Sequence, residues 1–294
     1  MSALLTVRIA QISDPHFGTE VDAVRDALLA DLHADPPDLL LLTGDITQRA
    51  RRTQFAAARD FLDALPPMPR ICLPGNHDLP LFDVFTRFTQ PYGRFRRFIS
   101  PQREPVFEDV RLAVLGVDAT SPWRHKDGKV DAAQIHRLAS RIARLPQPFR
   151  LVATHQPLAS ATHSDTRNVI HGAPQALQRW IGAGADLFLG GHIHLPYCLQ
   201  VGTPDGHRRA MLLQAGTCIS HRIRQGVPNS YNVIVLEQDL AQRRMHMERR
   251  DFDATTGAFM PRHRHVAVNA LRTGAAHGDA STADSWNLVA EASA

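Results

Sequence analysis

The sequence predicts an α/β fold in which two β-sheets lie face to face, with helices outside each sheet. The first part of the chain repeats a strand, a loop and a helix-like segment three times, which is typical of a mostly parallel, buried sheet. One of these strands is a run of four leucines, 39–42, as expected for a strand covered on both faces. The last third, 197–250, alternates apolar and polar residues, which indicates antiparallel strands.

Local patterns place the individual elements. Apolar runs predict strands at 5–12, 39–42, 71–73, 106–109, 112–117, 150–154, 187–189, 212–216 and 231–236. Apolar residues at helical spacing predict helices at 20–33, 53–65, 131–145 and 173–183, and proline pairs at 36–37 and 66–67 end the first two. The chain has 294 residues, 44% of them hydrophobic, so it can bury one large core. We therefore expect a single domain over 1–268.

Two segments depart from this alternation. Residues 79–105 are rich in Phe, Pro and Arg, which indicates a surface insertion or cap over one rim of the fold. Either its aromatic rings pack inward while its arginines face water, or it grips a phosphate, a base or an acyl chain. Residues 269–294 are rich in Ala, Gly, Ser, Thr and Asp, and we expect a flexible C-terminal tail. Its apolar patch at 286–289 would dock on its own domain or on a neighbour.

Composition limits the classes of function. A net charge of +4 suits an anionic substrate but is too small to predict specific nucleic-acid binding. The three cysteines, Cys72, Cys198 and Cys218, cannot all pair within one chain, which favours free thiols in a reducing compartment. The first ten residues lack a secretory pattern, and no apolar stretch reaches the roughly 20 residues that span a bilayer. These features predict a cytoplasmic protein without a transmembrane segment.

Potential metal ligands stand in five short clusters, each where a predicted strand ends. The clusters are Asp14-Pro15-His16, Gly44-Asp45, Gly75-Asn76-His77-Asp78, His155 and Gly191-His192-Ile193-His194. Carboxylate, amide and imidazole groups are the ligands that hard and borderline divalent metals prefer. Glycines beside several of them allow the backbone to turn sharply.

Taken singly, most clusters have an ordinary structural explanation. Asp14 suits a turn, Asp45 suits a helix N-cap and His155 suits a hydrogen-bonded core histidine. The pair His192 and His194 is more specific, because two imidazoles two residues apart can each serve a different metal. Five clusters at five strand ends are hard to explain as separate turns. Together they predict a site for two metal ions.

In this combination the motifs resemble those of the calcineurin-like metallophosphoesterases. Their short form is similar to bacterial class III cyclic-nucleotide phosphodiesterases, and they span Asp14 to His194, about two thirds of the chain. The resemblance implies a four-layer αββα sandwich with a dinuclear metal centre at the strand ends. The implied ligands of the first metal are Asp14, His16, Asp45 and His194, and those of the second are Asp45, Asn76, His155 and His192.

One departure distinguishes this chain from the protein phosphatases of that superfamily. They carry Gly-Asp-x-x-Asp-Arg-Gly, whereas this chain reads Gly-Asp-Ile-Thr-Gln-Arg-Ala over 44–50. Gln48 replaces the carboxylate that would orient an acid histidine, which argues against a protein phosphatase. Asp78 is then the nearest candidate to orient His77. Arg49 either contacts phosphate or caps the helix that it precedes.

The expected mechanism follows from charge. A water that bridges two divalent cations loses a proton near neutral pH, and the hydroxide attacks phosphorus in line. The metals stabilise charge on the phosphoryl oxygens, and His77 is placed to protonate the leaving oxygen as general acid. The ligand set contains no thiolate, so Mn, Fe, Co, Zn or Ni could bind, and the resemblance favours Mn and Fe.

These features predict a phosphodiesterase for small phosphodiesters, with cyclic nucleotides as candidates. The alternatives are a pyrophosphatase of a UDP-linked lipid precursor, a nuclease, and a non-catalytic scaffold with the same fold. The modest net charge argues against a nuclease, and the complete ligand set argues against a scaffold. Further candidates to line the pocket are His163, Asp165, His171, His221 and Arg222.

Overall fold

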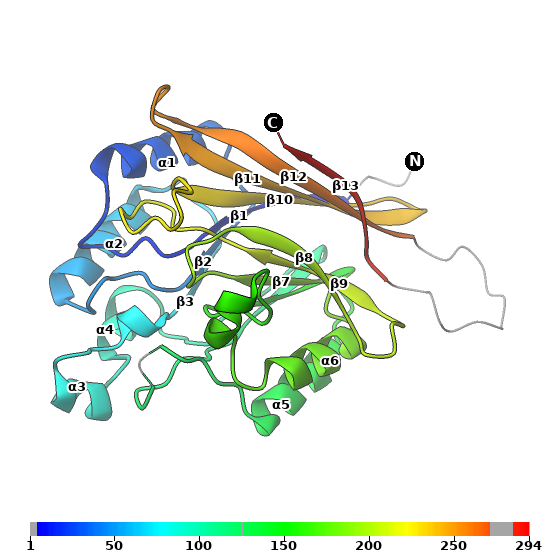
Figure 1. Ribbon diagram of the computed structural model, residues 1–294, viewed down its shortest axis with the longest axis horizontal. Helices are drawn as coiled ribbons and strands as arrows, with labels where there is room; N and C mark the ends of the chain where they lie inside the picture. The colour runs from blue at the N-terminus through cyan, green and yellow to red at the C-terminus, as the bar shows by residue number, and fades with distance from the viewer. Residues whose placement is uncertain (1–4, 125, 271–284, 294) are drawn as a thin grey trace.

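The computed structural model describes residues 5–124, 126–270 and 285–293, and Figure 1 shows their arrangement. The helices are α1 (Asp22–Ala34), α2 (Arg52–Ala64), α3 (Val84–Thr89), α4 (Gly93–Phe98), α5 (Ala132–Ile142) and α6 (Ala173–Ala183), with short 3₁₀ turns at Asn76–Asp78 and His163–Asn168. The strands are β1 (Leu5–Ile12), β2 (Leu39–Thr43), β3 (Arg70–Leu73), β4 (Val106–Glu108), β5 (Leu112–Gly116), β6 (Phe149–Ala153), β7 (Leu187–Gly190), β8 (Tyr197–Gly202), β9 (Arg209–Gln214), β10 (Ser230–Gln238), β11 (Gln242–Asp253), β12 (Ala258–Ala270) and β13 (Asn287–Ser293).

Two mixed sheets form the centre of the fold. The first sheet has the strand order β13-β12-β11-β10-β1-β2-β3, in which β1, β2 and β3 are parallel and β10 to β13 are antiparallel. The second has the order β4-β5-β6-β7-β9-β8, with parallel strands β5, β6, β7 and β9 and an antiparallel strand at each edge. The parallel strands other than β9 are those that follow the predicted alternation of strands and helices. Strand β9 lies in the segment for which the sequence predicts antiparallel strands, and it is antiparallel to β8 but parallel to β7.

Three apolar cores among the described residues divide the fold into four layers. Helices α1 and α2 cover the outer face of the first sheet, where Leu28 and Phe55 pack. The opposite face of that sheet meets the second sheet, and Leu39 and Leu151 belong to the core between them. Helices α5 and α6 cover the outer face of the second sheet, around Trp180. The predicted αββα architecture is therefore confirmed, and the four-leucine strand is buried on both faces as expected.

The C-terminal segment differs from the flexible tail that the sequence predicts. Strand β13 pairs antiparallel with β12 at the edge of the first sheet. Trp286 is fully buried between the sheets, where its Nε1 donates a 2.8 Å hydrogen bond to Asp186 Oδ1. Of the predicted apolar patch, Trp286 therefore docks on its own domain, because its indole gains both a core position and a buried acceptor, whereas Leu288 and Val289 stay exposed. Residues 271–284 and 294 of the predicted tail lie outside the described residues.

Trp286→Ala should lower the free energy of unfolding by about 3–5 kcal/mol, because it removes a fully buried indole and its hydrogen bond to Asp186. Urea unfolding followed by circular dichroism measures the change. The matched control is Trp123→Ala, whose indole is 81% exposed and should change stability by no more than about 0.5 kcal/mol. Equal shifts in the two variants would contradict the docking of this segment.

The insertion predicted at 79–105 contains α3 and α4, and α4 lies beside α2 at one end of the molecule (Figure 1). In α4 the aromatic ring packs inward, since Phe95 is buried while Arg96 is exposed. In α3 the pattern is reversed: Arg87 is buried and Phe85 is exposed. The inward-aromatic interpretation is thus right for α4 and wrong for α3. None of the helices in the described ranges has the length and apolar character needed to cross a bilayer.

Candidate metal centre

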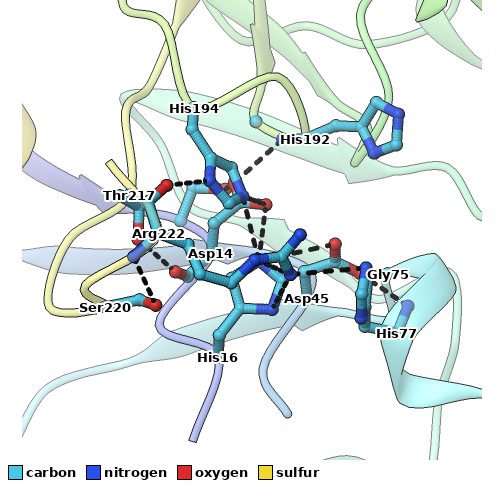
Figure 2. Close-up of polar contacts among 12 residues, drawn as sticks. Asp14, His16, Asp45, Gly75, His77, His192, His194, Thr217, Ser220 and Arg222 are labelled. Carbon is cyan, nitrogen blue, oxygen red and sulfur yellow. Dashed lines mark hydrogen bonds and ion pairs between the residues drawn. The ribbon is translucent and has the colours of Figure 1, made fainter. Parts of the chain in front are cut away.

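The loops that follow five strands meet at one edge of the two sheets. Asp14 and His16 follow β1, Asp45 follows β2, Asn76 and His77 follow β3, His155 follows β6, and His192 and His194 follow β7. Carboxyl ends of parallel strands share one edge of a sheet, which places each group of loops together. The backbone N–H of His192 then joins the two sheets by donating a 2.8 Å hydrogen bond to Asp14 Oδ2 (Figure 2). The structure thus gathers clusters that lie far apart in the sequence.

Six of the predicted ligand side chains form two groups, in each of which the ligand atoms lie within 4.8 Å of one another. The groups are Asp14, His16 and His194, and Asp45, His155 and His192. In the first group His194 Nε2 lies 3.3 Å from Asp14 Oδ1 and 2.9 Å from His16 Nε2. In the second group His155 Nε2 lies 3.3 Å from Asp45 Oδ1. The division is the same as the one between the two ligand sets that the family resemblance implies.

The carboxylate of Asp45 lies between the two groups. Its Oδ1 faces His155, while its Oδ2 lies 3.8 Å from His16 Nε2. The backbone N–H of His77 donates a 2.8 Å hydrogen bond to Oδ1, which fixes the orientation of the carboxylate. A carboxylate held in this way can offer one oxygen to each of two cations.

Several buried polar atoms at this edge have no hydrogen-bond partner among the described residues. They are Asp14 Oδ1, His155 Nε2, His192 Nδ1, and both the oxygen and the nitrogen of the Asn76 amide. An unsatisfied buried polar atom costs about 1–3 kcal/mol, so such atoms rarely gather without a reason. Carboxylate, amide and imidazole groups that converge in this way suit divalent cations, which would satisfy them. The residues present therefore fit a two-metal centre.

The backbone of the site is strained where the ligand residues lie. The positive φ angles are 52° at Asp14, 47° at His16, 48° at Asp45, 75° at His192 and 55° at His194. Left-handed conformations cost non-glycine residues on the order of 1–3 kcal/mol each, and they persist where the surrounding structure enforces them. Gly75 is required for a different reason, since a Cβ there would lie 2.1 Å from the backbone N of Asp45. The loops thus give up stability to aim these side chains at one point.

Backbone carbonyls orient two of the imidazoles. His155 Nδ1 lies 2.8 Å from the carbonyl oxygen of Thr43, and His194 Nδ1 lies 2.6 Å from that of Arg222. A carbonyl can only accept, so Nδ1 carries the proton in both rings. This leaves Nε2 of each ring as the atom that can bind a metal.

Burial and neighbouring charges shift the pKa values of the site in different directions. Burial lowers the pKa of His16 to about 3, and burial together with His155 lowers the pKa of His192 to about 4, so both rings are neutral and able to ligate. Against the effect of burial, the Asp45 carboxylate raises the pKa of His155 to about 9. Burial also opposes ionisation of Asp14, yet His194 holds the pKa of that carboxyl below its usual range. A cation that binds here must therefore displace a proton from His155.

The partner of His77 differs from the expected Asp78. His77 Nδ1 lies 2.9 Å from the backbone carbonyl oxygen of Gln48, which orients the ring, and His77 Nε2 lies 3.4 Å from Arg222 Nη1. The Asp78 carboxylate instead accepts hydrogen bonds from the backbone N–H groups of Gly75, Ile46 and Thr47. Adjacent residues in a 3₁₀ turn project in different directions, so Asp78 secures the loop that carries Asp45. Burial, with a smaller effect of Asp45, raises the pKa of Asp78 to about 7.

Arg222 lies at the centre of the site, and its guanidinium points toward His16 and His77 (Figure 2). Its Nη1 donates a 2.9 Å hydrogen bond to Gln48 Oε1, lies 3.3 Å from both ring nitrogens of His16 and lies 3.4 Å from His77 Nε2. From the sequence, Arg222 is only one of several candidates to line the pocket. The sequence signal was weak, because the loop after Gly216 has no spacing that demands a functional arginine.

The other pocket candidates have different positions. His163, His171 and His221 are exposed, whereas Asp165 is buried and forms a 2.7 Å ion pair with Arg224.

A buried polar layer that the sequence did not predict lies beneath the loops. Gln11 Nε2 donates a 2.9 Å hydrogen bond to the Gly190 carbonyl, and Gln11 Oε1 accepts one of 2.9 Å from Asn232. These bonds connect β1, β7 and β10 directly below the site.

The four-layer fold and its two-part centre of Asp, Asn and His side chains define the class of the protein. The chain belongs to the calcineurin-like phosphoesterase family, whose model matches residues 7–196. All the clusters that carry the resemblance lie in that range. Membership of this family supports a metal-dependent phosphoester hydrolase.

Individual relatives agree with this assignment. The chain is 30% identical over 164 residues to a probable cyclic nucleotide phosphodiesterase of Synechococcus, a match that covers 52% of this chain and 60% of the relative. A purple acid phosphatase from yellow lupin seeds is similar in structure, with a TM-score of 0.61, 12% identity, and coverage of 87% of this chain and 53% of that chain. A dimetal phosphatase from Danio rerio has a TM-score of 0.60 and 14% identity, with coverage of 87% and 98%. At these identities the two solved structures show a shared fold.

Proposed function

We propose that this protein is a two-metal phosphodiesterase that hydrolyses small phosphodiesters, with cyclic nucleotides as the first substrates to test. The observation that carries the proposal is the set of buried, unpartnered ligand atoms grouped on either side of Asp45. The similarity to a probable cyclic nucleotide phosphodiesterase supports the choice of a diester over a monoester. A scaffold without catalysis would have no use for these costly groups.

In this proposal Asp14, His16, Asp45 and His194 hold one metal, and Asp45, Asn76, His155 and His192 hold the other. The donor atoms are carboxylate oxygen, amide oxygen and imidazole nitrogen, and the family resemblance favours manganese or iron over zinc, cobalt or nickel. When bound, the two cations would supply a nucleophilic water and neutralise charge on the phosphoryl oxygens.

The protein side chains supply the remaining steps. His77 Nε2, which lies 3.4 Å from Arg222 Nη1, would donate a proton to the leaving oxygen, while the Gln48 carbonyl holds the other ring nitrogen. Arg222, held by the Gln48 side chain, would bind a non-bridging phosphoryl oxygen beside His77. Gln48 therefore serves both groups, one through its backbone and one through its side chain.

Arg222→Ala should lower kcat/KM for a phosphodiester about 100-fold, because it removes a charged donor that faces the phosphoryl group. The metal content should be unchanged, because alanine keeps the backbone carbonyl that holds His194, and the side-chain contacts that are lost, 3.3 Å from the His16 ring nitrogens, would not hold a metal. Arg222→Lys should recover part of the loss, because it keeps the charge but not the planar fork. Steady-state kinetics and metal analysis of both variants measure this. Loss of metal from the alanine variant would contradict a role in substrate binding.

The proposed function is tested with metal-stripped protein that is reconstituted with Mn²⁺. Hydrolysis of bis(p-nitrophenyl) phosphate is compared with that of p-nitrophenyl phosphate, and 3′,5′-cyclic AMP and cyclic GMP follow. We expect metal-dependent turnover with a clear preference for the diester. A preference for the monoester would point to a phosphatase. Two bound metals with no turnover of any of these compounds would overturn the proposal in favour of a more demanding substrate.

A further inference from the structure

An exposed apolar surface lies on α3 and on the loop that packs beside it. It consists of Phe82 (78% exposed), Val84 (60%), Phe85 (78%), Phe88 (47%) and Trp123 (81%), which together we call the aromatic face. The rings of Phe88 and Trp123 are in contact, with centroids 4.6 Å apart. Soluble proteins seldom expose so many large apolar side chains together unless the surface binds something.

Hydrogen bonds hold the two segments of the aromatic face together. Arg87, on the opposite side of α3, is buried and donates hydrogen bonds to the carbonyl oxygens of Pro122 (2.7 Å) and Arg124 (3.1 Å). These bonds fasten α3 to the loop that carries Trp123. With the arginine directed inward, the apolar side chains of this helix are directed to the outside. Their exposed fractions of 47–81% show that they project from the surface, so a single small ligand could cover only part of them.

The segments that carry the aromatic face are basic. Residues 79–98 and 121–130 contain seven basic and two acidic residues, and one of the basic residues is the buried Arg87. Both acids are near arginines: Asp83 is 3.4 Å from Arg94, and Asp127 is 4.0 Å from Arg124. Lys126 is exposed on the loop beyond Trp123. An apolar surface with this surplus of cations is complementary to a surface that is apolar beneath and negatively charged above.

We propose that the aromatic face docks on an anionic membrane surface, with Phe82, Phe85 and Trp123 entering the headgroup region. A second copy of the chain fits less well, because a two-fold contact would bring the two positive surpluses together. The exposed Val84 favours lipid over a nucleic acid, because an aliphatic side chain offers no surface on which a base can stack. This inference does not depend on the proposed reaction.

Docking would bring the metal centre close to the membrane. The Arg49 guanidinium lies 5.9 Å from the centroid of the Phe82 ring, and the neighbouring residue Gln48 contacts both Arg222 and His77. Phe82 of the aromatic face is therefore linked to Arg222 and His77 through the adjacent residues Arg49 and Gln48.

Trp123 provides a direct reporter for the test. Of the three tryptophans in the chain, Trp180 and Trp286 are 0% exposed, so a change in emission on binding would come from Trp123. The full-length protein is mixed with phosphatidylcholine vesicles and with vesicles that also contain phosphatidylglycerol. We expect a blue shift and co-sedimentation with the anionic vesicles alone, and both should weaken as salt is raised. Phe85→Ser/Phe88→Ser should weaken binding at least tenfold, and its thermal midpoint and metal content show whether it is folded.

Four outcomes would overturn the proposal. The first is the absence of binding to anionic vesicles, and the second is equal binding by the folded double-serine variant. The third is a blue shift without vesicles that accompanies dimer formation in sedimentation equilibrium. The fourth is tight binding of an oligo(dT) probe that the double-serine variant loses, with no binding to lipid.

Discussion

Asp45→Asn is expected to reduce the bound metal from two ions per chain to one or none and to lower phosphodiester hydrolysis at least about 1,000-fold, or about 4 kcal/mol of barrier. The reason is geometric, since the two oxygens of Asp45 face opposite ligand groups. Asparagine keeps the size of the side chain and tolerates the left-handed backbone, φ 48°, of this position. It also retains an oxygen to accept the hydrogen bond from the His77 N–H. The substitution therefore removes the bridging charge with little change to the fold.

Metal analysis by inductively coupled plasma mass spectrometry and steady-state kinetics on bis(p-nitrophenyl) phosphate measure the effect of Asp45→Asn. The matched control is Asp60→Asn on α2, where the carboxylate is exposed and the same change of charge should alter neither metal content nor rate. An Asp45→Asn variant that keeps two metals and near-normal turnover would remove this carboxylate from the bridging position.

The fold could be predicted largely because its parallel strands are simple in sequence. A strand such as Leu39–Thr43 is buried on both faces and is apolar throughout, and a helix with its own apolar stripe follows it. Strands β11 to β13 were harder to predict. In β11 the buried positions alternate with charged ones, and β13 follows a long stretch of small and polar residues. The buried indole of Trp286 anchors the start of that last strand. A periodic sequence pattern does not reveal the importance of a single residue.

The site could be predicted to the extent that its ligands are side chains at strand ends. The clusters could be recognised because each joins a ligand-type residue to a turn, and the fold then brings the turns to one edge of both sheets. The groups that orient the imidazoles of the site are mostly backbone carbonyls, such as those of Thr43, Gln48 and Arg222. Every residue has a carbonyl, so nothing in the sequence marks these. This is also why the predicted role of Asp78 failed, since chain adjacency to His77 gave it no hydrogen bond to that ring.

Arg222 illustrates a second limit. Its guanidinium reaches the site from a loop that follows the second sheet, and it lies beside Gln48 only because the loops of both sheets meet there. The sequence shows that Gln48 stands where related protein phosphatases have a carboxylate, but it does not show which group replaces that charge. The structure pairs the neutral Gln48 side chain with the cationic Arg222. This pairing gives the site a positive group, which no carboxylate neutralises because position 48 is a glutamine.

His77→Ala is expected to retain both metals and to lose about 100- to 10,000-fold in turnover on an alkyl phosphodiester, the range typical of general acid catalysis. On bis(p-nitrophenyl) phosphate the loss should be small, because p-nitrophenolate leaves without a proton. Metal retention is expected because the contact of His77 with Asp45 is made by its backbone N–H, which alanine keeps. The matched control is His221→Ala, an exposed histidine on the loop of Arg222 that should change neither rate.

The ratio of the two losses decides the role of His77. The ring is held at Nδ1 by the Gln48 carbonyl, and its Nε2 lies 3.4 Å from Nη1 of Arg222, beside the proposed position of the phosphoryl group. A proton donor at that position affects only esters whose leaving oxygen needs a proton. A side chain that merely shapes the pocket or holds Arg222 would affect both esters alike. Equal losses on the two substrates would therefore assign His77 to positioning, and a loss confined to the alkyl ester would assign it to proton transfer.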